Sequence, residues 1–314
     1  MNTPLITAVI CTYNRKDYLR RAVESLLKQT LARNKFEILI VDNGSVDGTP
    51  QVVSDLRQLD PEIRYTLEPT LGVSHARNQG WRQATAEYVA YLDDDELAAP
   101  DWLETILKVF SVTPKNTGCI GGKEVLRWES ARPAWLPDQI LYYLGQLDLS
   151  NELIEIKGPS WLGGGNSAYR REVLKAFGGF DTRLGRKGNS LLSMEDTLIQ
   201  KRLVAAGIAV YYHPDIIIEN AVPSARVTQE WFKKRAFWEG ISEAFAAEYK
   251  SLLAYFRLPK TTARASAAIL LKPKRLLALI TPTNNPDRFL QKCIAWNRLG
   301  YIYGNCVRVL GKRR

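Results

Sequence analysis

The sequence predicts an α/β fold in which parallel strands alternate with helices, and three observations support this prediction. Two apolar runs of strand length, rich in β-branched residues, occupy residues 5–11 (LITAVIC) and 36–42 (FEILIVD). Unusual polar clusters follow the predicted strands, and this is where open α/β sheets bind their ligands. The apolar residues between the two runs have the spacing of one helix face, and they are Leu19, Ala22, Val23, Leu26 and Leu27.

The same strand–helix unit repeats over the first hundred residues. Asn14 is expected to cap the helix between the first two strands. A proline after a threonine predicts a second helix over about 50–59, which leads into a strand at 63–67. A third helix over about 76–84 precedes a strand that ends at Asp93. This alternation predicts right-handed crossovers and a largely parallel sheet.

The pattern changes after the first hundred residues. Residues 117–157 lose the simple alternation and predict a mixed-sheet or loop insertion. A short helix is expected at 171–177, and a longer one over 195–206 has a glycine placed as its C-terminal stop. An amphipathic helix is predicted over about 228–249.

Composition indicates an ordinary globular protein of the reducing cytoplasm. The chain has 314 residues, of which 46% are apolar and 24% charged. The four cysteines stand far apart without CxxC spacing, which predicts neither a zinc site nor a disulfide framework. The first residues lack the pattern of a signal peptide, and no apolar run approaches the roughly 20 residues of a membrane span. A cytoplasmic location is therefore expected.

The positive charge is concentrated in the C-terminal part. Residues 241–314 hold 14 Lys and Arg against 3 acids, whereas residues 1–240 hold 29 against 30. This asymmetry predicts a main domain over 1–240 and a basic amphipathic helical extension over 241–314. The extension is expected to bind the anionic cytoplasmic face of a membrane, and the alternative is a set of helices with a solvated basic face. No nucleic-acid partner is expected, because the main domain is nearly neutral and no helix-turn-helix or RNP motif occurs.

Three consecutive carboxylates, Asp93, Asp94 and Asp95, follow the apolar run at 88–92. Adjacent like charges repel one another unless a positive group lies between them. Carboxylate oxygens are preferred ligands of magnesium, manganese and calcium. The triplet therefore predicts a divalent cation that holds a phosphorylated donor, and the acidic pair at 195–196 offers a separate general base. The alternative is an acidic turn that caps the following helix.

At this point the sequence resembles the family 2 glycosyltransferases with the GT-A fold. The resemblance covers about residues 5–240 and keeps the order of the family's motifs, which are TYNR at 12–15, VDNGSVDGT at 41–49, GVSHARNQG at 72–80, YLDDDE at 91–96, WLGGGN at 161–166 and ED at 195–196. It implies a Rossmann-like mixed sheet flanked by helices, followed by the basic helical extension.

The resemblance also implies a reaction. A sugar would move with inversion from a nucleoside diphosphate sugar to a glycan or a lipid-linked acceptor hydroxyl, in polysaccharide or glycolipid assembly. Two other functions compete with this one. They are a sugar nucleotidyltransferase of related fold and a non-enzymatic protein that binds anionic surfaces.

For the cation, the resemblance implies Mn²⁺ or Mg²⁺. Asp95 would be the principal ligand, and Asp93 and Asp94 would contact the ribose or metal-bound water, with Asp93 also counted as a ligand. Many relatives carry a further metal-binding histidine where this chain has Glu219 and Asn220. Metal affinity is therefore expected to be weaker, or the site to be completed by Glu219.

For the nucleotide, the resemblance assigns Asp42 to the imide N–H of uracil, which favours a UDP sugar. The alternative for Asp42 is an Asx turn, because Asn and Gly follow it. The other residues implied to bind the nucleotide sugar are Thr12, Tyr13, Arg15, Arg77 and Asn78.

For the chemistry, Asp196 matches the family's general base, and Glu195 would orient the acceptor. The alternative is that both acids only stabilise a helix N-terminus, where carboxylates are favoured. The glycine-rich segment before them is expected to form a floor between donor and acceptor. Its residues are Trp161, Gly163, Gly164, Gly165 and Asn166.

Overall fold

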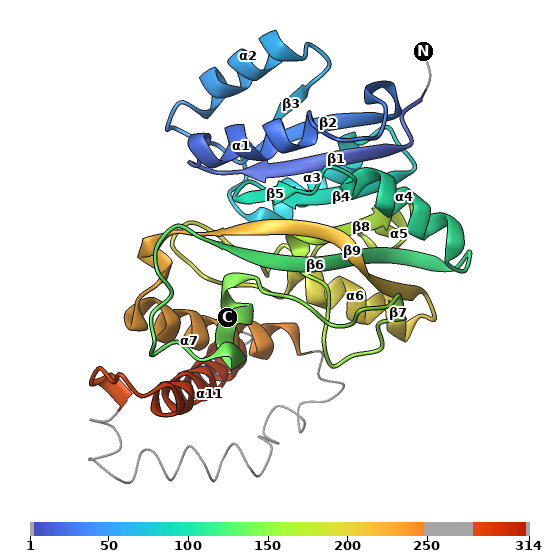
Figure 1. Ribbon diagram of the computed structural model, residues 1–314. Coiled ribbons are helices and arrows are strands. Elements are labelled where there is room, and N and C mark those ends of the chain that lie inside the picture. Colours follow the sequence, from blue (N-terminus) through green and yellow to red (C-terminus); the bar gives the residue numbers. More distant parts are fainter. Residues whose placement is uncertain (1–2, 248–278, 312–314) are drawn as a thin grey trace. The chain divides into compact units, whose positions relative to one another are not determined.

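The computed structural model describes residues 3–247 and 279–311 (Figure 1). Its contacts divide the chain into two compact units. Unit 1 comprises Met1–Arg127, Gly145–Gly188 and Glu195–Ala221, and unit 2 comprises Trp128–Leu144, Asn189–Met194 and Val222–Arg314. The separate extension over 241–314 stays a prediction. Its apolar and basic segments AAILL (267–271) and KPKR (272–275) lie outside the described residues.

Unit 1 is built on a mixed sheet, as expected. Strands β1, β2, β3 and β4 are parallel, while β8, β6, β9 and β5 continue the sheet in the order β3-β2-β1-β4-β8-β6-β9-β5 and β7 pairs with β9. The register places Thr12 beside Asp42 and Cys11 beside Asp93, so the carboxyl ends of three strands meet at one edge. The strand bounds are β1 Ile6–Thr12, β2 Phe36–Asp42, β3 Arg64–Leu67, β4 Tyr88–Asp93, β5 Glu96–Ala98, β6 Thr117–Trp128, β7 Ile154–Glu155, β8 Ser167–Arg170 and β9 Ala209–Val222.

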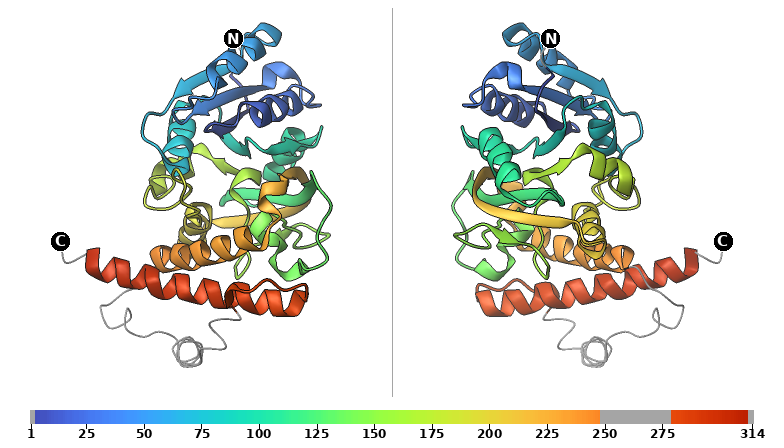
Figure 2. Two further views of the ribbon diagram at one scale, coloured as in Figure 1. Left: turned by 90° about the vertical axis from the view of Figure 1, so that its left-hand side faces the viewer. Right: turned by 90° about the vertical axis from the view of Figure 1, so that its right-hand side faces the viewer.

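Helices pack on both faces of this sheet because its central strands are apolar on both sides (Figures 1 and 2). Ile10 of β1 belongs to the core under α1, α2 and α4, and Val9 belongs to the core under α3, α5 and α6. The helix bounds are α1 Lys16–Leu26, α2 Thr49–Leu59, α3 Val73–Gln83, α4 Trp102–Val112, α5 Arg171–Phe177 and α6 Glu195–Ala205, with 3₁₀ turns at Arg33–Lys35 and Gly164–Asn166.

The loop that follows β1 corrects one prediction. Asn14 does not cap α1, because it has a positive φ of 53° and its Oδ1 accepts the N–H of Val46 at 2.7 Å. The first turn of α1 is satisfied from the neighbouring loop instead, where Asp47 Oδ2 accepts the N–H of Lys16 at 3.0 Å. The loops after β1 and β2 therefore hold each other, which a search for local capping residues could not detect.

Unit 2 contains two long helices that lie side by side (Figure 2), α7 Gln229–Ala246 and α11 Pro286–Gly311, with 3₁₀ segments at Asp138–Leu144 and Ser224–Arg226. Gly240 of α7 and Gly300 of α11 lie at the crossing, where a Cβ on either would overlap a backbone carbonyl of the facing helix. The glycines thus permit a close helix approach. Within the described ranges, no helix is long and apolar enough to cross a membrane.

Candidate active site

The acidic turn after β4 is bound to the end of β1. Arg15 Nη1 lies 2.9 Å from Asp94 Oδ1 and 2.8 Å from Asp95 Oδ2, and Thr12 Oγ1 donates to Asp94 Oδ2 at 2.9 Å. Burial raises the pKa of Asp94 to about 6, a shift that Arg15 opposes and Asp95 reinforces. The structure therefore brings Thr12, Arg15, Asp94 and Asp95 together, with a guanidinium between the two carboxylates.

Arg77 of α3 connects the acidic turn to α6. It is buried, and its Nη2 lies 2.8 Å from Asp93 Oδ1 while its Nη1 lies 2.6 Å from Glu195 Oε1. The rings of Tyr91 and Phe180 flank its guanidinium. Burial opposes the charged form, yet the two acids hold the pKa of Arg77 well above its usual value. The outer nitrogens of Arg77 thus face carboxylates, whereas the family resemblance assigned them to a diphosphate or uracil.

The acidic pair at the start of α6 is divided by its surroundings. Glu195 is buried, and burial followed by the charge of Asp196 raises its pKa to about 7, against the effect of Arg77. Asp196 is only half-buried, and its Oδ1 accepts the N–H of Thr197 at 2.6 Å. Of the two carboxylates, Asp196 is therefore the more accessible to a substrate.

The glycine triplet is explained by three charged side chains beneath it. A Cβ on Gly163 would overlap the carboxylate of Glu124, and one on Gly165 would overlap that of Glu96. A Cβ on Gly164 would overlap the guanidinium of Arg77. Only glycine lets the backbone approach these groups so closely. The predicted floor therefore lies directly over charged groups of the site.

Glu96 and Glu124 received no role from the sequence. Glu96 Oε2 accepts the N–H of Asp93 at 2.9 Å. Burial, followed by the charge of Asp93, raises the pKa of both glutamates well above the usual value. The available signal for Glu124 was a single carboxylate in the otherwise apolar start of strand β6, directly after CIGGK.

We call this group the carboxylate cluster; it consists of Asp93, Asp94, Asp95, Glu96, Glu124, Glu195 and Asp196. The arginines that pair with its members in the structure are Arg15 and Arg77. Acids outnumber these cations, so the cluster attracts either protons or a further cation. In the part of the chain that the structure describes, no three His, Cys, Asp or Glu side chains converge as ready metal ligands. The donor set itself consists of hard oxygens, which fit Mg²⁺ or Mn²⁺ once Arg15 moves away.

Glu219 and Asn220, which replace the histidine of many relatives, lie on β9. Asn220 is paired with Glu96 of β5 in the sheet, whereas the carboxylate of Glu219 lies 3.8 Å from Arg127. Completion of a metal site by Glu219 stays a prediction.

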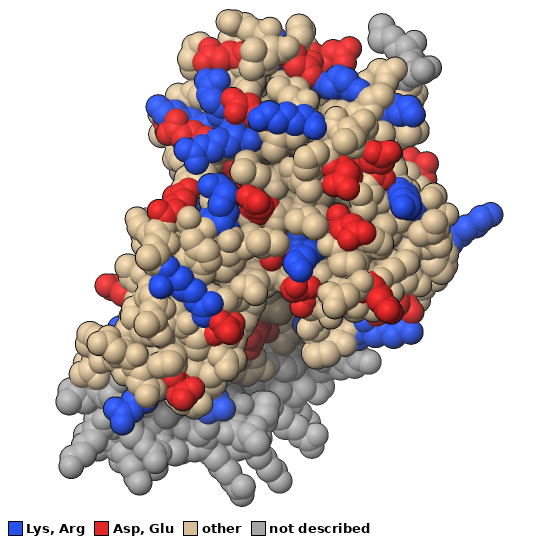
Figure 3. Space-filling view, viewed as in Figure 1, with Lys and Arg blue, Asp and Glu red and all other residues tan. Residues whose placement is uncertain are grey.

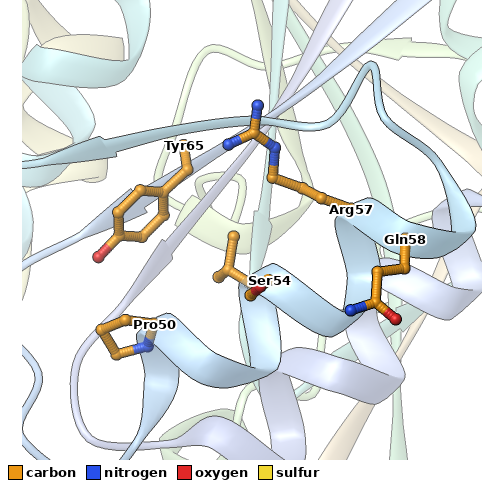
Figure 4. A pocket seen from close by; sticks show the side chains of 6 residues that line it. Pro50, Ser54, Arg57, Gln58 and Tyr65 are labelled. Atoms are coloured by element: carbon orange, nitrogen blue, oxygen red, sulfur yellow. The ribbon is translucent and has the colours of Figure 1, made fainter.

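Asp42 is buried at the end of β2 and has two partners. Its Oδ1 accepts the N–H of Ser45 at 2.8 Å, which is the Asx turn that the sequence left open. Its Oδ2 accepts the hydroxyl of Tyr65 at 2.8 Å, and burial followed by Asp42 raises the pKa of Tyr65 to about 12. The ring of Tyr65 lines a surface cavity of about 290 Å³ beside α2 (Figure 4). Recognition of uracil by Asp42 stays a prediction.

The remaining predicted residues fall into two groups. The side-chain amides of Asn78 and Asn166 are buried and used internally. Asn78 bonds to Phe180 and to the indole of Trp81, while Asn166 bonds to Trp102 and to two backbone carbonyls. Tyr13 is exposed, and Trp161 carries the Lys201 ammonium over its ring. The structure does not connect these four side chains to the carboxylate cluster through any interaction described above.

Comparison with known proteins identifies the family. The model of the family described as Glycosyl transferase family 2 matches residues 7–178, which is more than half of the chain. The chain belongs to this family. It is therefore a glycosyltransferase (EC 2.4), and this membership favours sugar transfer over the two competing functions.

Similar proteins agree with this assignment. The chain is 27% identical over 243 residues to a glucosyl-dolichyl phosphate glucuronosyltransferase of Haloferax volcanii, with 76% of each protein covered. It is also 27% identical over 243 residues to the succinoglycan biosynthesis protein ExoM of Rhizobium meliloti, covering 74% of this chain and 71% of that protein. A solved mannosyltransferase from Pyrobaculum calidifontis, in complex with GDP-Man and Mn²⁺, has a TM-score of 0.59 at 22% identity and covers 100% of this chain and 89% of its own. This likeness confirms the GT-A fold.

Proposed function

We propose that the protein is an inverting glycosyltransferase that moves a sugar from a nucleoside diphosphate sugar, UDP-linked by the reading of Asp42, to a glycan or lipid-linked acceptor hydroxyl. The observation that carries this proposal is the single guanidinium of Arg77 between Asp93 and Glu195. It joins the acidic turn proposed to hold the donor to the helix that carries the proposed base. Relatives named for a dolichyl phosphate substrate and for succinoglycan biosynthesis support a role in glycolipid or polysaccharide assembly.

In the proposed reaction, Asp196 accepts the proton of the acceptor hydroxyl as its oxygen forms a bond to the anomeric carbon. The bond from that carbon to the diphosphate breaks on the opposite side, and the electron pair leaves with the diphosphate. Glu195 is buried and paired with Arg77, so it positions the start of α6.

We further propose that a divalent cation, Mn²⁺ or Mg²⁺, binds at Asp95 with Asp93. When bound, it supplies charge stabilisation for the leaving diphosphate. Support comes from the hard oxygens of the acidic turn and from the Mn²⁺ in the complex of the similar mannosyltransferase. In this proposal Arg15 leaves Asp94 and Asp95 when the cation enters and contacts the diphosphate through its guanidinium.

Arg15→Gln should bind Mn²⁺ alone about tenfold more tightly than the wild type, a change of ~1.4 kcal/mol. The variant removes a positive group that occupies Asp94 and Asp95 at 2.8–2.9 Å. The same variant should bind UDP with Mn²⁺ more weakly, because the diphosphate loses a guanidinium. Electron paramagnetic resonance of free Mn²⁺ and calorimetry with UDP measure the two affinities.

The matched control is Arg20→Gln, which removes an arginine of the same helix that pairs with Asp55 instead. It should change neither affinity. Equal or weaker binding of Mn²⁺ alone by Arg15→Gln would show that Arg15 does not compete with the cation.

Unit 2 supports a lipid-linked acceptor and a peripheral position on an anionic, cytoplasmic membrane face. Burial, followed by the charges of Lys233 and Arg288, lowers the pKa of Lys292, so these three cations lie close enough to affect one another. Crowded cations favour anionic groups such as lipid phosphates. The basic surplus of residues 241–314 adds to this attraction. On the face shown in Figure 3, by contrast, acidic and basic side chains are interspersed.

Co-sedimentation with vesicles tests the membrane proposal. The protein should pellet with phosphatidylglycerol vesicles in 0.1 M NaCl and be released in 1 M NaCl, because the Debye length falls from about 10 Å to about 3 Å. Pure phosphatidylcholine vesicles are the control and should bind little protein. Equal binding to both kinds of vesicle would refute an electrostatic attachment.

A panel of nucleotide sugars tests the proposed function as a whole. The true donor should raise the melting temperature, more so with Mn²⁺, because a ligand that binds only the native state stabilises it by mass action. Incubation of that donor with lipid and glycan acceptors should then release the nucleoside diphosphate. The proposal fails if no nucleotide sugar stabilises the protein under any of these conditions.

A further inference from the structure

Unsatisfied polar atoms gather at the carboxylate cluster. Among the described residues, buried side-chain atoms without a hydrogen-bond partner include Glu124 Oε1, Asn220 Oδ1, Glu195 Oε2 and Arg77 Nε. Buried polar groups are normally paired, and leaving one unpaired costs stability. Three of these four atoms are acceptors. Their concentration in one place indicates a ligand that supplies hydrogen-bond donors.

Two of the acceptors belong to one subsite. Glu124 is 5% exposed and Asn220 is 8% exposed, and both lie against Gly145. A Cβ on Gly145, which has a φ of 95°, would overlap the amide of Asn220 and would lie 3.5 Å from Glu124 Oε2. On another side of the same carboxylate lies Gly163, also without a side chain. We call Glu124 and Asn220, with these two glycines, the β6–β9 subsite.

The β6–β9 subsite lies within reach of both proposed reaction partners. The negative charges of Asp93 and Asp196 both act on Glu124, with Arg77 opposing them. In the proposed function, Asp93 belongs to the donor motif and Asp196 accepts the acceptor's proton. The sugar that is transferred must lie between these two positions, because its anomeric carbon exchanges one bond for the other.

The surroundings also restrict the charge of that sugar. Arg77 is the cation that acts on Glu124, and it is already shared by Asp93 and Glu195. A uronate would bring another carboxylate into a group where acids already exceed cations, and like charges at close range repel. Hydroxyl groups, in contrast, donate to unpaired acceptors at no such cost.

We propose that Glu124 and Asn220 bind the transferred sugar of the donor through its hydroxyl groups, and that this sugar is uncharged. The inference rests on the proposed function and extends it to the substrate class. It assigns Glu124 as a specificity-determining residue.

Calorimetry on the intact chain separates this inference from the proposed function. The ligands are UDP and UDP-glucose, or the nucleotide and neutral nucleotide sugar that the stabilisation panel selects. Glu124→Leu should weaken binding of the nucleotide sugar at least tenfold and change binding of the nucleotide less than twofold. Glu124→Gln keeps the shape of the side chain and serves if the leucine variant does not fold; it should weaken the nucleotide sugar by several-fold. Glu172→Gln, an exposed acid on α5, is the control and should change neither.

A second arm tests the charge. The wild type should bind UDP-glucuronate at least tenfold more weakly than UDP-glucose, and Glu124→Gln should narrow this ratio. Tighter binding of the uronate by the wild type would overturn the uncharged class. Unchanged donor affinity in both Glu124 variants, with a raised acceptor KM, would place the subsite on the acceptor and overturn the donor assignment. If the wild type binds no nucleotide at all, the proposed function itself fails.

Discussion

Asp196→Asn is expected to slow sugar transfer by about 10²–10⁴-fold, the usual contribution of a general base. Asparagine has nearly the shape of aspartate but cannot accept the proton of the acceptor hydroxyl. The half-buried carboxylate lies at the start of α6, next to the buried Glu195 that pairs with Arg77. Because Asp196 is not proposed to hold the nucleotide, affinity for the nucleoside diphosphate should stay within about twofold of the wild type.

The measurement is kcat at saturating donor and acceptor, with the melting temperature as a check on folding. Asp215→Asn, an exposed acid on β9, is the matched control and should transfer sugar at the wild-type rate. Full activity of Asp196→Asn would rule out its role as base. Loss of activity in Glu195→Gln but not in Asp196→Asn would exchange the two roles.

Arg77→Met should destabilise the protein by about 3–5 kcal/mol, the usual result of removing one partner of a buried ion pair. Two carboxylates would lose their counter-charge, and that of Glu195 is buried. Asp93, at 39% side-chain exposure, would be partly rehydrated, so Glu195 should account for most of the loss. Arg77→Lys should rescue only part of it, because an ammonium cannot bridge two acids as a guanidinium fork does.

Urea denaturation measures this loss, and Arg82→Met, an exposed residue of the same helix, is the control. The pKa of Glu195 is already raised to about 7 in the wild type, and removal of Arg77 raises it further. Below that pKa the carboxyl is neutral and needs no counter-charge, so the destabilisation should shrink as the pH falls from 8 to 6. A loss that is independent of pH would show that Arg77 acts through packing alone.

Local patterns predicted the secondary structure of unit 1 well where the pattern was strong. Strand β2 and helix α5 begin and end where the sequence predicted, because continuous apolar β-branched runs and helical spacing leave few alternatives. The role of Asn14 was wrong because its partner, Val46, comes from a different loop. Capping rules consider only neighbours in sequence, whereas this contact depends on the register of β1 and β2.

The order of the motifs also led to the right family, but pairwise geometry was invisible from the sequence. Strand-end positions indicated that Thr12, Asp42 and Asp93 meet at one edge, and the parallel register confirms it. Nothing in the sequence showed that Arg77 would face two acids rather than open space. Glu124 was missed because a single glutamate in a strand has no motif of its own.

The sequence by itself determined the α/β alternation, the glycosyltransferase family and the concentration of positive charge in residues 241–314, since these depend on the kind of residue and its spacing. Only the tertiary structure decided which charges pair. Ion pairs such as Arg15 with Asp95 and Arg77 with Glu195 join residues about 80 and 118 positions apart, and Coulomb energy depends on distance in space. For the same reason, the surplus of acids beneath the glycine triplet, from which an uncharged sugar is inferred, exists only in the folded chain.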